Sequence, residues 1–199
     1  YRQEDLVELP GRPGCLQMCV GVESFSREAL RDAHKLQNHP ERYGQIARLC
    51  RAHGITSHFS NILGFPSDTE DSVLEHLNTL RELGPDVASF YILTPIPGTE
   101  QYEDFLEQGL ITEPNLDRFD GACVTWRHPF LEPGRWADLL YRCYRDFYAG
   151  RDVAAKLLRL ASSRWDFRTA GGLLAVFGYS VQSRLSAVSG ATSLSSRPS

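Results

Sequence analysis

The sequence predicts an α/β fold with a parallel sheet, and three observations support this prediction. Three short apolar segments have the length of buried strands, at residues 16–22, 55–63 and 86–93. Each is followed by a stretch with helical periodicity, and their starts lie about 30 to 40 residues apart, the size of one βαβ unit. None alternates cleanly between apolar and polar residues, which is typical of parallel strands covered on both faces.

The segments between these strands carry helix start and stop signals. Pro40 has the first position of a predicted helix, and Gly54 ends that helix. Ser67 and Glu70 have the spacing of a capping box at the start of a second helix. A third helix is predicted over residues 99–108.

Beyond residue 110 the alternation of strands and helices stops. Apolar residues recur at helical spacing over 136–148, and a further helix is predicted over 152–164. Residues 173–188 are amphipathic, and we favour a helix packed on the domain over one lying in a membrane interface. We therefore divide the chain into an α/β part (1–110), a helical extension (111–165), and an amphipathic helix with a disordered tail (166–199).

The composition excludes several classes of protein. Twenty-one basic and 25 acidic side chains give a net charge of −4, so no nucleic-acid partner is expected. No run of about 18 apolar residues is present, so no transmembrane segment is expected. Five irregularly spaced cysteines favour a reducing, cytoplasmic setting over a disulfide framework. The sequence starts at Tyr1, and nothing near it is typical of a signal peptide, so we expect a fragment of a longer protein or a processed chain.

Polar residues and glycines follow each predicted strand, at the position where α/β proteins bind ligands. Glu23 comes directly after the first strand and could accept hydrogen bonds from a ribose or an amino group. An equally weighted alternative is structural. In that interpretation Glu23 favours the N-terminus of the next helix, and Ser24 is the N-cap of that helix.

The second and third strands end with further candidates. Ser60 and Asn61 are polar residues inside the second strand, and one of the two should point into the interior, where it needs a hydrogen-bond partner. Ligand binding and structural hydrogen bonding are comparable interpretations for this pair. We favour a tight strand-to-helix turn at residues 64–66, in which Gly64 allows the close approach of a ligand or of backbone. Two prolines stiffen the loop at residues 94–99, which is more often a structural feature.

The cysteines do not form a recognisable metal motif. Cys15 and Cys19 are spaced Cys-x3-Cys, but the third cysteine of an iron–sulfur loop would have to stand at position 22, which is Val22. We therefore favour core packing of both thiols on one side of the strand, and predict no metal ligands in this chain. Cys50 and Cys143 are predicted on apolar helix faces.

In their order and spacing, these motifs resemble the second half of a radical S-adenosylmethionine (SAM) enzyme barrel, of the subgroup often fused to a cobalamin-binding domain. The resemblance lies within residues 20–148 and leaves residues 160–199 unmatched. Its segments are 20–24 (VGVES), 35–38 (KLQN) with Tyr43, 53–55 (HGI), 62–66 (ILGFP) with Asp68 and Thr69, 94–99 (TPIPGT) with Tyr102, then Gly109 and Phe147-Tyr148.

The resemblance implies that residues 1–110 form the C-terminal half of a partial (βα)6 TIM-like barrel, followed by a helical C-terminal extension. In this family a Cys-x3-Cys-x2-Cys loop holds the [4Fe-4S] cluster, and the sequence lacks that loop, so the cluster ligands are expected outside this fragment. The parent enzyme would cleave SAM to a 5′-deoxyadenosyl radical, with cobalamin as a further candidate cofactor for methyl transfer. Its partners would be a small-molecule substrate, an external electron donor and the N-terminal half of the same protein.

The resemblance also implies roles for residues at the strand ends, although it assigns no catalytic residue. Glu23 and Ser24 would contact the amino or ribose part of SAM. Ser60 or Asn61, together with Gly64, would border the ribose and adenine. The last strand would contribute Tyr91 and Thr94, near the adenine or the substrate.

Two other hypotheses remain open at this point. The chain could be a non-catalytic α/β half-barrel or binding module that lacks the cluster half, since three βα units leave sheet edges that pair with other chains. A different TIM-type barrel enzyme is a weaker hypothesis. It would need a catalytic acid or base at the strand ends, and Glu23 is the one good candidate.

Overall fold

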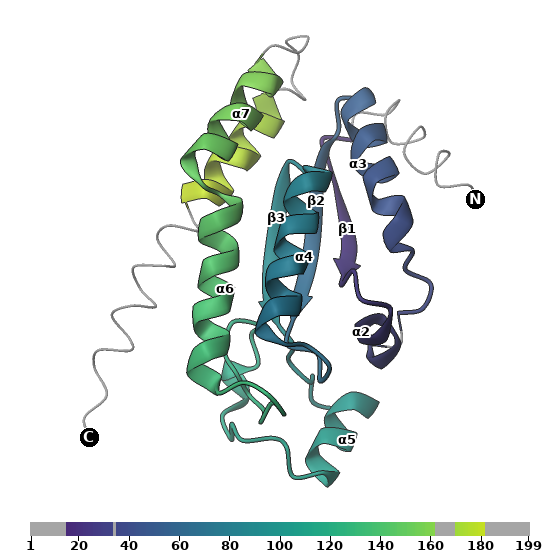
Figure 1. The fold of residues 1–199 in the computed structure, drawn as a ribbon, viewed down its shortest axis with the longest axis vertical. Coiled ribbons are helices and arrows are strands. Elements are labelled where there is room, and N and C mark those ends of the chain that lie inside the picture. The colour runs from purple at the N-terminus through teal and green to yellow at the C-terminus, as the bar shows by residue number, and fades with distance from the viewer. Residues whose placement is uncertain (1–14, 34, 162–169, 182–199) are drawn as a thin grey trace.

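A computed structural model describes residues 15–33, 35–161 and 170–181 of the chain, and it contains the predicted parallel sheet (Figure 1). The strands are β1 (Gln17–Glu23), β2 (Thr56–Leu63) and β3 (Val87–Ile92). They pair in the order β1-β2-β3, and both pairings are parallel. The three apolar segments are therefore confirmed as neighbouring strands of one sheet.

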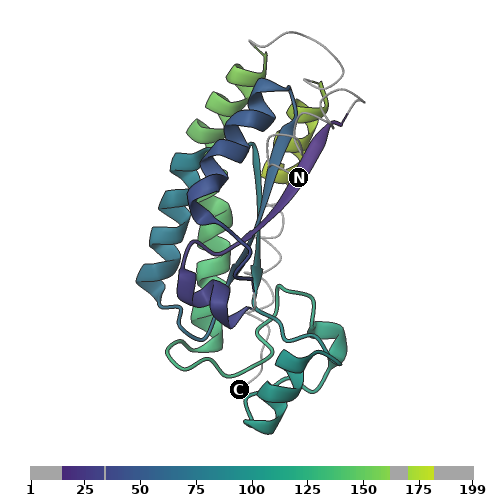
Figure 2. The ribbon, with the colours of Figure 1, turned by 90° about the vertical axis from the view of Figure 1, so that its right-hand side faces the viewer.

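Helices follow each strand, as the punctuation predicts. The longer helices α3, α4, α6 and α7 lie on one side of the sheet, whereas the helical residues 170–181 lie on the other side (Figure 2). The helices are α2 (Arg27–Asp32), α3 (Tyr43–Ala52), α4 (Glu70–Leu83), α5 (Glu100–Glu107), α6 (Pro133–Phe147) and α7 (Gly150–Ala161), with short 3-10 turns at Pro40–Arg42 and Leu116–Arg118.

The main core lies between the sheet and its helices. Phe59 and Leu63 of β2 are fully or almost fully buried there, together with Leu80 of α4 and Trp136 of α6. Cys50 and Cys143 are completely buried in this core, as predicted, and burial raises the pKa of both thiols. A second cluster, formed by Ala29, Phe65, Leu93, Phe105 and Trp126, lies beyond the carboxyl ends of the strands, where α5 packs (Figure 1).

Two tyrosines of the helical extension cover the outer edge of β3. The Tyr144 hydroxyl lies 3.0 Å from both the amide nitrogen and the carbonyl oxygen of Phe90. The Tyr148 hydroxyl bonds the backbone of Ala88 in the same way, at 3.0 and 2.8 Å. The Ile92 amide donates to the Gly121 carbonyl at 2.6 Å. This edge therefore has hydrogen-bond partners for its backbone without a further strand.

The prediction that both Cys15 and Cys19 pack in the core is wrong for Cys19. Cys15 is partly buried against the core, but Cys19 is exposed. The alternation of β1 explains this, because Val20 and Val22 turn toward the helices and Cys19 and Gly21 turn to the opposite face. That face is covered near the start of the strand and open near its end.

The helical residues 170–181 cover the start of that opposite face. Val176 is completely buried, and the Tyr179 ring packs edge-on against His58 of β2 with 5.1 Å between ring centroids. The prediction of a helix packed on the domain is thus confirmed for these residues, while residues 182–199 lie outside the described part. No helix among the described residues is long and apolar enough to cross a membrane.

The N-cap of α4 differs from the predicted one. Thr69, not Ser67, accepts the first helical hydrogen bond, from the Ser72 amide at 3.2 Å, and the Ser72 hydroxyl accepts from the Thr69 amide at 2.9 Å. The chain is still in a turn before this point, since Asp68 binds the amides of Gly64 and Phe65. The capping box therefore begins two residues later than the Ser67–Glu70 spacing suggests.

This difference gives a direct test of the fold. We expect Thr69→Ala to lower the free energy of unfolding by about 1 kcal/mol, because it removes the N-cap acceptor. Ser67→Ala is the matched control, because the Ser67 hydroxyl is buried and has no hydrogen-bond partner in the described structure. Its effect should stay within about 0.5 kcal/mol. Urea unfolding monitored by circular dichroism measures both values, and a larger loss for Ser67→Ala would contradict the observed cap.

Candidate functional site

Alternation along β2 sends the two adjacent polar candidates to opposite faces of the sheet. Asn61 is completely buried on the face that carries the helices, where it bonds His76 of α4. Ser60 shares the other face with His58, whose ring lies against Tyr179. The sequence therefore offers two candidates at one strand end, but the structure brings only Ser60 to the face that is free of the long helices.

The residues that the structure brings together form what we call the open face. This face consists of Gly21 and Glu23 of β1, Ser60 of β2 and Tyr91 of β3, on the side of the sheet away from α3, α4 and α6. Gly21 pairs with Ser60 in the sheet register, and Ser60 pairs in turn with Ser89 of β3, two residues before Tyr91. The side chain of Tyr91 is 43% exposed, so an aromatic surface is available beside the polar groups.

Glu23 has an unusual backbone conformation that places its carboxylate on this face. Its φ is +58°, the one positive φ among the described residues other than glycine. A Cβ atom built on Gly21 would lie 2.8 Å from the Glu23 Oε1 atom, so the side chain folds back over Gly21. Burial raises the pKa of the Glu23 carboxyl, and the positive charge of Lys35 partly opposes this rise. The result is a half-buried acceptor beside a position without a side chain.

The segment after α5 forms one wall of the open face. Gly121 has φ +77°, and a Cβ atom built on it would lie 3.1 Å from the Tyr91 ring, so the glycine allows close packing there. Thr94 lies just past β3, and its hydroxyl donates to the Ile92 carbonyl at 3.0 Å. Thr94 therefore has a structural hydrogen bond at this strand end. Sequence reasoning did not single out Gly121, because its partner is 30 residues away in the chain.

Asn61 belongs to a buried polar network on the helix face. Its amide nitrogen donates to the carbonyls of Phe59 and Ser89 at 3.0 and 3.1 Å. Its oxygen must then accept from His76 Nε2, which lies 2.9 Å away, and this fixes the histidine tautomer. Burial lowers the pKa of His76 to about 4, so the imidazole is neutral at physiological pH. Asn61 acts here as a structural residue.

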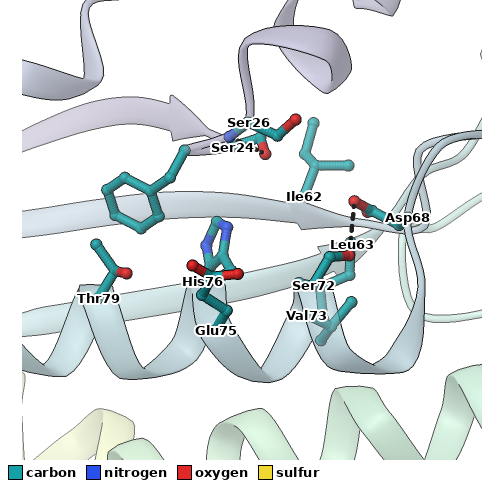
Figure 3. Close-up of a pocket in the computed structure, with 11 residues that line it drawn as sticks. Ser24, Ser26, Ile62, Leu63, Asp68, Ser72, Val73, Glu75, His76 and Thr79 are labelled. Atoms are coloured by element: carbon teal, nitrogen blue, oxygen red, sulfur yellow. Dashed lines mark hydrogen bonds between the residues drawn. The ribbon is translucent and has the colours of Figure 1, made fainter.

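Ser24 lies beside His76 in a cavity of about 260 Å³ between the end of β1 and α4 (Figure 3). Asp68, Ser72 and Glu75 also line this cavity. The expectation that Ser24 is an N-cap is wrong, because Ser26 caps α2 and the Ser24 hydroxyl accepts from the Ser26 amide at 3.1 Å. Ser24 therefore lines this cavity against α4 and is not one of the residues of the open face.

Gly64 is used in a turn. With φ +87°, it presents its amide to Asp68 Oδ2 at 2.8 Å, and the adjacent Phe65 amide donates to the same oxygen. The closest group to a Cβ atom built on Gly64 would be the Trp136 indole, at 3.8 Å. The interpretation of Gly64 as a tight strand-to-helix turn is therefore the one that matches these contacts.

Two further residues, Asn38 in the loop before α3 and Tyr43 at the start of α3, support the candidate site. Asn38 and Tyr43 hydrogen-bond the backbone at the end of β1, next to Glu23. Both residues belong to the segments quoted for the family resemblance, at 35–38 and 43, and this was the one sequence signal that could have identified them. The sequence alone does not explain why an asparagine and a tyrosine are needed there. Among the residues that the structure describes, no group of three or more His, Cys, Asp or Glu side chains could hold a metal ion.

The chain resembles methyltransferases in sequence. No family model matches it. It is 24% identical over 146 residues to a bacteriochlorophyllide d C-8(2)-methyltransferase from Chlorobaculum tepidum, a match that covers 73% of this chain and 32% of that enzyme. It is 27% identical over 164 residues to a cytidylyl-2-hydroxyethylphosphonate methyltransferase from Streptomyces wedmorensis, covering 76% of this chain and 30% of that enzyme. The chain thus spans about a third of the length of these relatives.

The fold resembles that of a radical SAM methyltransferase. The solved structure is TsrM from Kitasatospora setae with cobalamin and a [4Fe-4S] cluster bound. It matches this chain with a TM-score of 0.58 and 16% sequence identity, over 93% of this chain and 44% of that chain. The α/β architecture described above is therefore shared with part of the fold of that protein.

The buried His76 should make stability depend on pH in a specific direction. Its pKa falls from the usual value near 6.5 to about 4 on folding, so the unfolded chain takes up the proton first. The free energy of unfolding should therefore decrease as the pH falls from 6.5 to 4, by about 3 kcal/mol from this residue. His76→Gln keeps an N–H group for Asn61 but does not titrate, so it should lack this component. Urea unfolding of both proteins at several pH values tests this, and parallel pH profiles would contradict it.

Proposed function

We propose that this chain supplies the SAM-binding open face of a radical SAM methyltransferase. The observation that carries the proposal is that Glu23, Ser60 and Tyr91 share one face of three consecutive parallel strands, toward their carboxyl ends. Ligands bind at this end of α/β sheets. The sequence likeness to methyltransferases and the fold likeness to TsrM support the choice of SAM chemistry. A three-stranded sheet in sequential order is also suitable as part of the wall of a partial barrel.

The open face fits the chemistry of SAM, which when bound supplies a transferable methyl group or a radical. The Glu23 carboxylate can accept hydrogen bonds from ribose hydroxyls or an amino group. Gly21 leaves the room into which the Glu23 side chain folds, and the Ser60 hydroxyl, on the residue that pairs with Gly21, can donate or accept. The exposed Tyr91 ring provides a flat surface on which an adenine can stack. Thr94, just past the end of β3, is a further candidate for contact with the adenine or the substrate.

The [4Fe-4S] cluster does not fit the described residues, since they contain no cluster of metal ligands. We therefore place the cluster ligands in another part of the polypeptide, which would complete the barrel beside β1. Cobalamin would also bind outside this chain. In the subgroup that the chain resembles, an N-terminal domain binds it. The external electron donor would reduce the cluster in that other part of the polypeptide.

The substrate is proposed only as a small molecule. The two relatives described above methylate unlike compounds, a bacteriochlorophyllide and a cytidylyl phosphonate. What they share with this chain is therefore expected to serve SAM and not the substrate. Chemical specificity would then be determined by other segments of the polypeptide.

Replacement of Glu23 tests the proposed site. In the complete natural polypeptide, Glu23→Gln should weaken SAM binding at least about tenfold, because it removes a charge-assisted acceptor. Glu107→Gln on α5 is the matched control, since Glu107 is exposed and does not belong to the open face. Equilibrium dialysis with labelled SAM measures both affinities. Unchanged binding by Glu23→Gln, or no binding by the wild-type protein, would overturn the proposal.

A further inference from the structure

The end of β1 contains a tight, strained turn, and contacts with surrounding residues are needed to stabilise its conformation. The Ser24 amide donates to the Val22 carbonyl at 2.7 Å, which closes a three-residue turn with Glu23 at its centre. The positive φ of Glu23 makes this the rare and strained form of such a turn. The pairing with β2 is also irregular here, because Gly21 pairs with Ser60 and Glu23 pairs with the next residue, Asn61.

Asn38, before α3, and Tyr43, the first residue of α3, bind the carbonyls of this turn. The Asn38 amide nitrogen lies 2.9 Å from the Gly21 carbonyl and 3.3 Å from the Val22 carbonyl. The Tyr43 hydroxyl donates to the Val22 carbonyl at 2.9 Å. The Val22 carbonyl thus has three donors, and two of them come from side chains 16 and 21 positions later in the chain.

Tyr43 is held so that its hydroxyl has little freedom. Its ring packs edge-on against Phe25 and Phe59, with centroids 5.8 and 6.2 Å away, and its side chain is almost completely buried. Burial raises the pKa of Tyr43 to about 12, so the hydroxyl keeps its proton and remains a donor at physiological pH. The rigid α3 helix, which begins at Tyr43, therefore fixes one carbonyl of the turn.

We propose that Asn38 and Tyr43 are positioning residues, which hold the Gly21 and Val22 carbonyls so that Glu23 adopts its left-handed conformation and turns its carboxylate onto the open face. Strained conformations persist only where surrounding contacts determine them, and these hydrogen bonds supply such contacts. Neither residue belongs to the open face itself. The SAM-related consequence of this inference rests on the proposed function, whereas the conformation of Glu23 does not.

The first test is spectroscopic and needs no ligand. In the isotope-labelled 199-residue chain, Glu23 should give the strong intraresidue amide–Hα NOE of a left-handed residue. This NOE should weaken in Tyr43→Phe and in Asn38→Ala, and most in the double variant. Tyr148→Phe is the matched control, because it also removes a buried hydroxyl that bonds the backbone, but at Ala88 of β3. A left-handed Glu23 that persists in the double variant would overturn the inference.

The second test measures binding in the complete natural polypeptide. Tyr43→Phe and Asn38→Ala should each weaken SAM binding about five- to tenfold. They should cause little further loss in the Glu23→Gln background, because all three changes act through one carboxylate. Additive losses, as from a general effect on stability, would contradict the positioning role. If Glu23→Gln itself leaves SAM binding unchanged, the proposed function fails, and the NOE result still decides the role of Asn38 and Tyr43.

Discussion

A single buried carboxamide, that of Asn61, joins two strands and a helix, and it fixes how the sheet meets α4 at this point of the core. The group donates to carbonyls of β2 and β3 and accepts from His76 of α4. A buried amide that loses one of these partners keeps the desolvation cost without the bond, so each contact supports the others. Because Asn61 is committed to the helix face, the neighbouring Ser60 must turn to the other one. The composition of the open face follows from this commitment.

The two faces of the sheet consequently differ in how their polar groups are used. On the helix face, Asn61 is satisfied by His76, and Asp68 accepts from the backbone amides of the turn. On the open face, Glu23 and Tyr91 keep atoms that are available to a ligand. The strained turn at Glu23 is consistent with this division, since unusual backbone conformations are concentrated at functional sites.

Local patterns predicted the strands well, because apolar runs punctuated by glycine and proline carry that information directly. They also located the loops that contain the candidate site. They did not separate Ser24, Asn61 and Gly64 from the open face, because His76 and Trp136, the groups near Asn61 and Gly64, stand in helices elsewhere in the chain. The position of the α4 cap depends likewise on how Asp68 ends the preceding turn. The division of the chain at residues 110 and 165 stays a prediction.

Tyr144 and Tyr148, which bond the outer edge of β3, limit where a further strand can join the sheet. The hydroxyls of Tyr144 and Tyr148 occupy backbone groups at the outer edge of β3, so these groups are not available to pair with a further strand. In the part of the chain that the structure describes, no strand pairs with the outer side of β1. A strand that joins this sheet must therefore be added next to β1, and its carboxyl end, if parallel, would arrive beside Glu23. A strand added at this edge would therefore lie beside the residues for which ligand binding is proposed.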